Sequence, residues 1–211
     1  MKHKKLLSLA AFTLALLFSG CRPGGAEYIS DLDVVGTAYT KEIDFSGRKT
    51  YAMWDSIPQI SGDQLEPGET PKYVSQTYAN VVTSEIDKQM KALGWTKVGR
   101  DQNPDAYIQN ASMQNTYVYY YYSYYYYGYY YPYSGWYYPG YYPPTYSTTT
   151  TGTLLMMLVD AKTESTSPNG TQPVLWIGII NGLMEGSSSS FTSRVSKNVG
   201  QAFKQSPILK R

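Results

Sequence analysis

A run of tyrosines in the middle of the chain sets the strongest limit on how this sequence can fold. Residues Tyr117–Tyr146 contain 18 of the 24 tyrosines, and Ala106–Val159 contains no Asp, Glu, Lys or Arg. Glycines and prolines interrupt the run repeatedly, which disfavours one long helix or strand. The sequence on either side is patterned, so we expect a single domain, residues 31–207, with a tyrosine-rich insertion at 117–151.

The first 20 residues have the three parts of a secretory signal. A basic start with three lysines precedes the apolar stretch Leu6–Phe18, which is too short to span a bilayer comfortably. The small pair Ser19-Gly20 then precedes Cys21, the only cysteine, and this order resembles a bacterial lipobox. In such signals the peptidase cuts before the cysteine, whose sulfur carries diacylglycerol.

We therefore expect residues 1–20 to be a lipoprotein signal peptide and Cys21 to be lipidated. The following residues, to position 30, then form a flexible tether with Pro23, Gly24 and Gly25. A diacylglycerol on the sulfur and an amide-linked acyl chain together anchor a protein stably in a bilayer. The membrane is therefore the expected partner of diacylglyceryl-Cys21. The alternative is an ordinary signal peptide followed by a free cysteine.

Processing also removes most of the ionisable groups on which enzymes depend. The signal contains His3, the only histidine, and three of the 18 basic residues, which leaves 15 against 16 acidic ones. Histidine-dependent catalysis, imidazole-bound zinc and a cysteine nucleophile are therefore excluded. The slightly acidic mature chain gives no reason to expect a nucleic-acid partner, and we expect no metal and no cofactor.

Alternating or continuous apolar residues predict the strands of the domain. The first part of the chain gives Asp33–Thr40 and Thr50–Trp54, followed by a loop over Asp55–Thr70. The later strands are Trp95–Val98, Asp105–Val118, Gly152–Ala161 and Val174–Ile180. The last two strands flank a turn rich in Ser, Pro, Asn and Gly, and this order is typical of a hairpin.

Two helices are predicted from apolar residues spaced three and four apart. The first covers Pro71–Leu93, with Thr70 as its cap and Gly94 as its stop. Its apolar stripe, which includes Tyr78 and Met90, is expected to face the core. The second covers about Phe191–Lys204, and Pro207 limits it. Two amphipathic helices over a mainly antiparallel sheet form an α+β two-layer sandwich.

Four short motifs resemble a bacterial lipoprotein family known as domain of unknown function 4136. DFSGRKTYAMW is similar to its aspartate-phenylalanine-serine segment and "KTYAW" strand, and NPDAYIQN to its "PDLLV" strand. GTLLMMLVDAKT is similar to "GTL…DLVDA", and VLWIG to "VWRG". The resemblance covers Asp33–Pro207, with Met53 and Ile177 as departures. It implies an envelope lipoprotein with this fold and a variable insertion, and the family has no established catalytic residues.

Several carboxylates are candidates for a calcium site or for acid–base catalysis because of their position or spacing in the sequence. Asp101, Asn103 and Asp105 imitate the start of a calcium loop, but Ala106 and Ser112 replace its essential Gly and Glu. A polar turn is the plainer interpretation. The acidic residues Glu27, Asp31 and Asp33 are expected to form a solvated face near the tether. Asp160 ends an apolar strand, where it serves either as a catalytic carboxylate or as a strand-end cap.

The tyrosine run itself is the candidate binding surface. Tyrosine stacks through its ring, hydrogen-bonds through its hydroxyl and loses little side-chain entropy when immobilised. A glycan or an envelope protein are the expected partners, whereas single-stranded nucleic acid needs a basic groove that is absent here. Self-association, binding to lipid headgroups, and an insertion without a function of its own remain alternatives. The candidate binding residues are Tyr119, Tyr120, Tyr121, Tyr122, Tyr124, Tyr125, Tyr126, Tyr127, Tyr129, Tyr130, Tyr131, Trp136, Tyr137 and Tyr138.

These observations predict a lipid-anchored protein of the outer membrane with a non-catalytic binding or structural role. We expect it on the periplasmic face, because no acidic cluster follows Cys21, with surface exposure as the alternative. The competing function is an envelope hydrolase that uses the carboxylates of the patterned domain, Asp160 above all.

Overall fold

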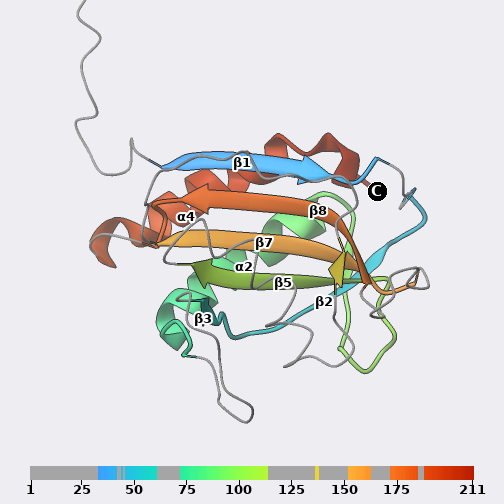
Figure 1. Ribbon diagram of the computed structural model, residues 1–211, viewed down its shortest axis with the longest axis horizontal. Helices are drawn as coiled ribbons and strands as arrows, with labels where there is room; N and C mark the ends of the chain where they lie inside the picture. The colour runs from blue at the N-terminus through green and yellow to red at the C-terminus, as the bar shows by residue number, and fades with distance from the viewer. Residues whose placement is uncertain are drawn as a thin grey trace, which may run out of the picture.

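One mixed β-sheet forms the centre of the domain (Figure 1). The computed structural model describes residues 33–41, 44, 46–60, 72–113, 136–137, 152–162, 172–184 and 188–211. Six strands lie in the order β1-β8-β7-β5-β2-β4, with β3 beside β5 and β6 beside β8. Their bounds are Val34–Tyr39 (β1), Thr50–Met53 (β2), Gln59–Ile60 (β3), Thr96–Lys97 (β4), Ala106–Met113 (β5), Trp136–Tyr137 (β6), Thr153–Asp160 (β7) and Gln172–Asn181 (β8).

The four long strands pair antiparallel, as β1 with β8, β8 with β7, and β7 with β5. The predicted hairpin is confirmed, because β7 and β8 are adjacent and joined by residues 161–171. The short strands β2, β3 and β4 extend the sheet through parallel pairing. Residues 59–60, which we expected in a loop, form β3 because they pair with the last two residues of β5.

Both described long helices, α2 (Gln76–Ala92) and α4 (Ser188–Lys204), cover the same face of the sheet (Figure 1). Their apolar stripes interleave with alternate residues of β5, β7 and β8. On the helix side these include Val82, Ile86, Val195 and Val199, and all four are buried. The α+β two-layer arrangement predicted from the helical periodicity is therefore confirmed.

Two buried tryptophans fasten the segment after α4 to this core. The indole N–H of Trp176 in β8 donates to Ser206 Oγ at 2.7 Å. The indole of Trp95 donates to the carbonyl of Leu209 at 2.7 Å, within the short 3-10 helix η2 (Pro207–Leu209). A buried indole needs such a partner, because an unpaired N–H in the core costs stability. The two bonds explain why the chain packs closely beyond Pro207.

Helix α2 begins at Gln76, five residues later than the sequence predicts. Residues 72–74, just before the helix, are extended because they pair with residues 57–59. The Gln59 N–H donates to the Lys72 carbonyl, and the Val74 N–H donates to the Ile57 carbonyl. Ser75 is consequently the N-cap, and its side chain makes no capping hydrogen bond. The predicted end of the helix is confirmed, since Gly94 follows with a φ of 91°.

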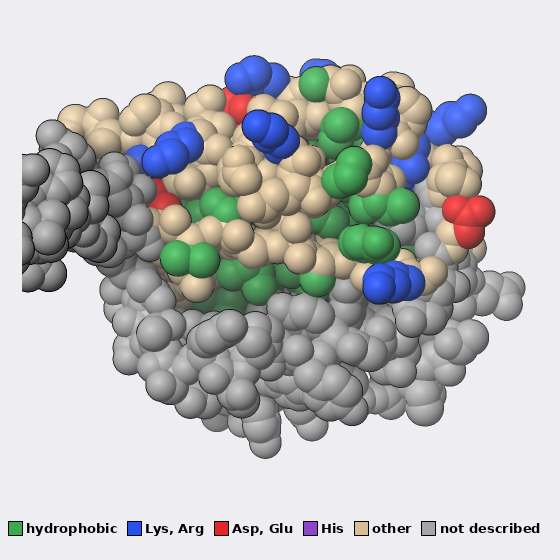
Figure 2. All heavy atoms as spheres, turned by 90° about the horizontal axis from the view of Figure 1, so that it is seen from above, with side chains coloured by type: hydrophobic (Ala, Val, Ile, Leu, Met, Phe, Trp, Pro, Cys, Tyr) green, Lys and Arg blue, Asp and Glu red, His purple; other side chains and the backbone are tan. Residues whose placement is uncertain are grey.

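Strand β1 forms one edge of the sheet, and among the described strands it pairs only with β8. Figure 2 looks onto this edge and shows Lys and Arg side chains spread over the helix side, with hydrophobic side chains between them. Val34 is 60% exposed and Tyr39 is 42% exposed. Neither described long helix has the length and apolar content needed to cross a membrane.

Candidate binding pocket

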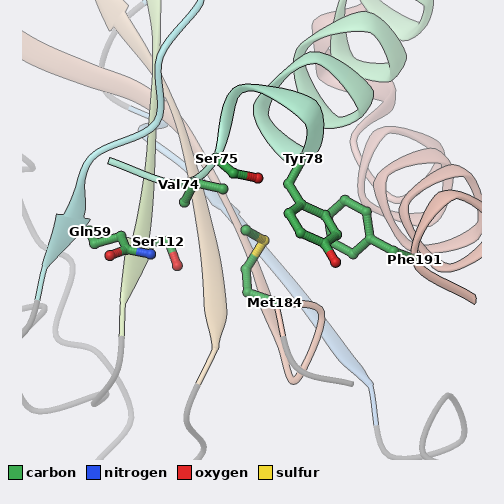
Figure 3. Close-up of a pocket in the computed structure, with 7 residues that line it drawn as sticks. All are labelled: Gln59, Val74, Ser75, Tyr78, Ser112, Met184 and Phe191. Carbon is green, nitrogen blue, oxygen red and sulfur yellow. The ribbon is translucent and has the colours of Figure 1, made fainter. Parts of the chain in front are cut away.

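A pocket of about 320 Å³ opens at the end of the sheet where β5 ends and α2 and α4 begin (Figure 3). Three of its lining residues come from the strand and helix termini at this corner: Ser112 of β5, Ser75 before α2, and Phe191 in the first turn of α4. The full lining is Gln59, Val74, Ser75, Tyr78, Ser112, Met184 and Phe191. Its volume lies at the lower end of the range for small-molecule sites.

Two aromatic rings form one wall of the pocket. Tyr78 of α2 and Phe191 of α4 meet edge to face, with ring centroids 4.5 Å apart and planes at 86°. Figure 3 shows Met184 beside these rings and Val74 across from them. Phe191 is 5% exposed, whereas the Tyr78 side chain is only partly buried. The sequence predicts Tyr78 as a core contact, and the structure places it both against the core and at the pocket.

The polar groups that line the pocket are uncharged. Gln59 and Ser112 are register partners of β3 and β5, and the Ser112 N–H donates to the Pro58 carbonyl at 2.8 Å. Ser75 adds a hydroxyl that no capping bond occupies. None of the seven lining residues is Asp, Glu, Lys, Arg or His. Such a lining suits a neutral group with one apolar side, because no counter-charge for an ion is present.

The tyrosine-rich insertion leaves and re-enters the domain at this same corner. Strand β5 ends at Met113 and β7 begins at Thr153, and these two residues are register partners. Met184, which lines the pocket, donates its N–H to the carbonyl of Gly152 at 2.8 Å. The two roots of residues 114–151 therefore lie beside the pocket.

Asp160, the candidate catalytic carboxylate, is held in a fixed ion pair. Its side chain is fully buried and accepts two hydrogen bonds from the Arg48 guanidinium, at 3.0 and 2.9 Å. The Lys162 N–H also donates to Asp160 Oδ1 at 3.0 Å. This geometry is that of a strand-end cap, which was the alternative interpretation of Asp160.

Asp105 has a comparable structural role one strand away. It accepts hydrogen bonds from the N–H groups of Lys49 and Thr50, both at 2.9 Å, and from the Thr50 hydroxyl at 2.8 Å. Burial raises the pKa of Asp105, but these hydrogen bonds lower it by more, so the pKa lies below its usual value. The carboxylate thus joins β5 to the start of β2. The described residues contain no group of three or more acidic, His or Cys side chains placed to hold a metal ion.

The prediction of a solvated acidic face is wrong for Asp33. Its side chain is 1% exposed and pairs with Arg194 of α4, whose Nη2 lies 2.5 Å from Asp33 Oδ1. Asn198, one turn further along α4, donates to Asp33 Oδ2 at 2.7 Å. Residues so far apart in sequence give no local signal of pairing, and only the folded β1–α4 contact brings them together. Glu27 and Asp31 lie outside the described residues.

The other predicted site residues lie largely outside the described part of the chain. These are Cys21, the signal and tether, and the candidate tyrosines from Tyr119 to Tyr131 together with Tyr138. Trp136 and Tyr137 are described as a backbone strand, β6, which pairs parallel with Gln172 and Pro173 of β8. Gln59, Ser75, Ser112 and Met184 were not predicted as site residues, because a pocket formed by strand ends and helix starts leaves no motif in the sequence.

The fold and its corner pocket define a small α+β domain with a sheet covered by two helices and a non-ionic site at one end. The family model "Domain of unknown function (DUF4136)" matches residues 35–208. The chain belongs to this family. No curated protein matches the chain.

Solved structures similar to the chain include a family member from Bacteroides thetaiotaomicron. It is 27% identical, and the alignment covers 84% of this chain and 97% of that one with a TM-score of 0.63. A PelC dodecamer from Paraburkholderia phytofirmans is 16% identical, covers 85% and 98% of the two chains, and has a TM-score of 0.36. That second similarity is too low to bear on the fold or function here.

Proposed function

We propose that this protein is a non-catalytic binding protein held at the outer membrane through diacylglyceryl-Cys21. Its ligand site is the corner pocket, beside the roots of the tyrosine-rich insertion. The observation that carries the proposal is the pocket's lining, which combines an aromatic wall of Tyr78 and Phe191 with uncharged polar groups. The periplasmic face of the membrane remains the expected location.

The pocket favours a neutral, amphipathic ligand such as a sugar ring of an envelope glycan. Aromatic rings stack on the apolar face of a sugar, and hydroxyl and amide groups bond to its edge. Ser112 and Gln59 supply those polar groups across from the rings, and Ser75 adds a hydroxyl on the side of Tyr78. The tyrosines of the insertion offer the same chemistry, since each has a ring and a hydroxyl.

A carboxylate-dependent hydrolase has weaker support. Such an enzyme needs a carboxyl group that reaches the substrate and a second group converging on it. Asp160, Asp105 and Asp33 instead bond to Arg48, to the start of β2, and to Arg194 respectively. None of the three lines the pocket.

The test fills the pocket without disturbing the fold. In Ser75→Trp the new indole occupies the mouth, and no side-chain cap is lost because Ser75 makes none. The matched control is Ser196→Trp on the exposed side of α4, away from the lining residues. Each purified variant is incubated with protease-treated envelope glycan, and the sedimented fraction is measured.

We expect Ser75→Trp to weaken binding at least about tenfold, equivalent to about 1.4 kcal/mol, and Ser196→Trp to bind like the wild type. Deletion of residues 117–146 should also reduce binding. If neither Ser75→Trp nor the deletion changes the sedimented fraction, the pocket is not the site. Binding only to envelope material that has not been treated with protease would assign a protein partner instead.

A further inference from the structure

The outward side of helix α4, together with the segment that follows it, is positively charged. Residues 188–211 contain five basic residues and no Asp or Glu. Two of the five are engaged within the domain: Arg194 pairs with Asp33, and the Arg211 guanidinium lies 4.6 Å from the ring centroid of Trp95. The three that remain are exposed and have no ion pair among the described residues: Lys197, Lys204 and Lys210.

An exposed apolar side chain accompanies these lysines. Lys197 and Lys204 are seven residues apart, so they lie on the same side of α4, two turns from each other. Ile208 of η2 lies between Lys204 and Lys210 in the sequence and is 42% exposed. Figure 2 shows Lys and Arg among hydrophobic side chains on the helix side of the molecule. Lysines beside exposed apolar residues are typical of helices that lie on the surface of a bilayer.

The neighbouring helix adds no unpaired negative charge. Glu85 and Asp87 are the two acidic residues of α2. They pair with Lys88 and Lys91 of the same helix, at 3.1 and 2.6 Å. The layer formed by α2 and α4 therefore keeps the positive charge of residues 188–211, and such a surface attracts an anionic partner.

The place where the chain enters the domain indicates that this partner is a membrane. Arg194 and Asn198 fix Asp33 to α4, so the chain enters beside this helix. Twelve residues separate Asp33 from Cys21, and twelve residues span at most roughly 40 Å. Helix α4 has 17 residues and is about 25 Å long. A bilayer that holds Cys21 is therefore within reach of the whole helix.

We propose that α4 and η2 lie on the bilayer that holds diacylglyceryl-Cys21. Lys197, Lys204 and Lys210 contact anionic lipid headgroups, and Ile208 enters the boundary between headgroups and acyl chains. This inference rests on the proposed anchor and adds an orientation to it, because an anchor alone does not decide which side of the domain faces the membrane. The attraction of each lysine to an anionic surface falls off within a Debye length. The contact must therefore depend on lipid charge and on salt.

A dye placed beside this surface measures the contact. Gln205 is exposed and lies next to Lys204, and Gln205→Cys gives the acylated protein a single free thiol, since Cys21 is the only cysteine. The purified lipidated protein is labelled there with a polarity-sensitive dye. It is then inserted into vesicles of phosphatidylcholine, either alone or with about one-third phosphatidylglycerol. Thr96→Cys provides the control position, because β4 lies at the opposite edge of the sheet from β1 and α4.

We expect the emission of the dye at position 205 to shift to shorter wavelength only in vesicles with phosphatidylglycerol, and to return as salt is raised. The dye at position 96 should not respond. Replacing the three lysines of the surface should reduce the docked fraction at least about tenfold; these substitutions are Lys197→Gln, Lys204→Gln and Lys210→Gln. A matched triple variant removes the same charge from exposed lysines beside β2, β3 and β4 and should keep the shift: Lys49→Gln, Lys72→Gln and Lys97→Gln.

Equal emission at position 205 in both kinds of vesicle would overturn the proposal, as would a shift at position 96. An equal loss in both triple variants would also overturn it, because net charge alone would then explain the contact. Failure of the anchor is seen separately, since a protein without acyl chains does not float with either kind of vesicle. In that case a His-tag in place of Cys21 holds the chain to nickel-chelating lipid, and the same comparisons decide.

Discussion

At the scale of single residues, Gly178 shows how closely the helix-bearing face is packed. A Cβ at this position would lie 2.6 Å from Cη2 of Trp176 and 2.8 Å from Cε of Met156. Trp176 is buried and bonded to Ser206, so its indole has little freedom to shift. Position 178 must be a glycine because the indole of Trp176 lies directly over it and leaves no room for a Cβ.

We predict that Gly178→Ala lowers the free energy of unfolding by about 1–3 kcal/mol, the usual cost of overpacking a core. Urea denaturation of the purified domain measures it. The control is Gly200→Ala in α4, where a Cβ would meet only Gln89 Nε2 at 3.6 Å. Alanine is the better helix former, so this variant should gain about 0.5–1 kcal/mol. A loss of equal size in both variants would show that Trp176 is not the cause.

Asp105 should make the free energy of unfolding depend on pH in the acid range. Its folded-state pKa is lowered, so its contribution to stability is present above its unfolded pKa and is lost as the pH falls through the folded value. Asp105→Asn should therefore cost about 1–2 kcal/mol at neutral pH, because it weakens charge-assisted hydrogen bonds. The difference from the wild type should shrink below about pH 4.

The measurement is the unfolding midpoint of both proteins between neutral pH and acid. Asp101→Asn removes the same charge from the same turn and controls for net charge alone. A wild-type advantage over Asp105→Asn that persists undiminished in acid would contradict this account of Asp105.

At the scale of elements, the buried pair of Asp33 and Arg194 joins β1 to α4. Removing one partner leaves the other buried without its counter-charge, which typically costs about 3–5 kcal/mol. We predict such a loss for Asp33→Ala and for Arg194→Met. The double variant should lose clearly less than the two single losses together, because no isolated charge remains. Urea denaturation of all four proteins measures the coupling, and strict additivity would exclude it.

Periodic patterns predicted the elements whose partners are apolar and near in sequence. Phe191, Val195 and Val199 marked α4, and the continuous apolar runs marked β7 and β8. The start of α2 was misplaced because residues 72–74 pair with residues 57–59, a contact without a local signal. Asp33 was misjudged for the same reason, since its partner lies 161 positions away. The pocket was missed because its lining comes from five separate places in the chain: β3, the start of α2, β5, the loop after β8, and α4.

At the scale of the whole molecule, the proposed anchor makes a direct prediction. Bacteria that express the protein and are fed an alkyne-bearing fatty acid should incorporate the label into it, and the protein should sediment with the outer membrane. Cys21→Ser removes the acylated sulfur, so the label should be lost and the protein should leave the membrane fraction. Ser19→Ala is the control, because it keeps a small residue in the signal. Label retained by Cys21→Ser would disprove lipidation at this cysteine.

The pairing of β1 with β8 has a consequence for how the chain acquires its structure. Val34 pairs with Asn181, and every other residue of β1 also pairs with a residue more than a hundred positions later in the chain. Folds dominated by such distant contacts fold slowly. During synthesis, β1 therefore stays unpaired until β8 has been made, and an unpaired strand is a template for aggregation.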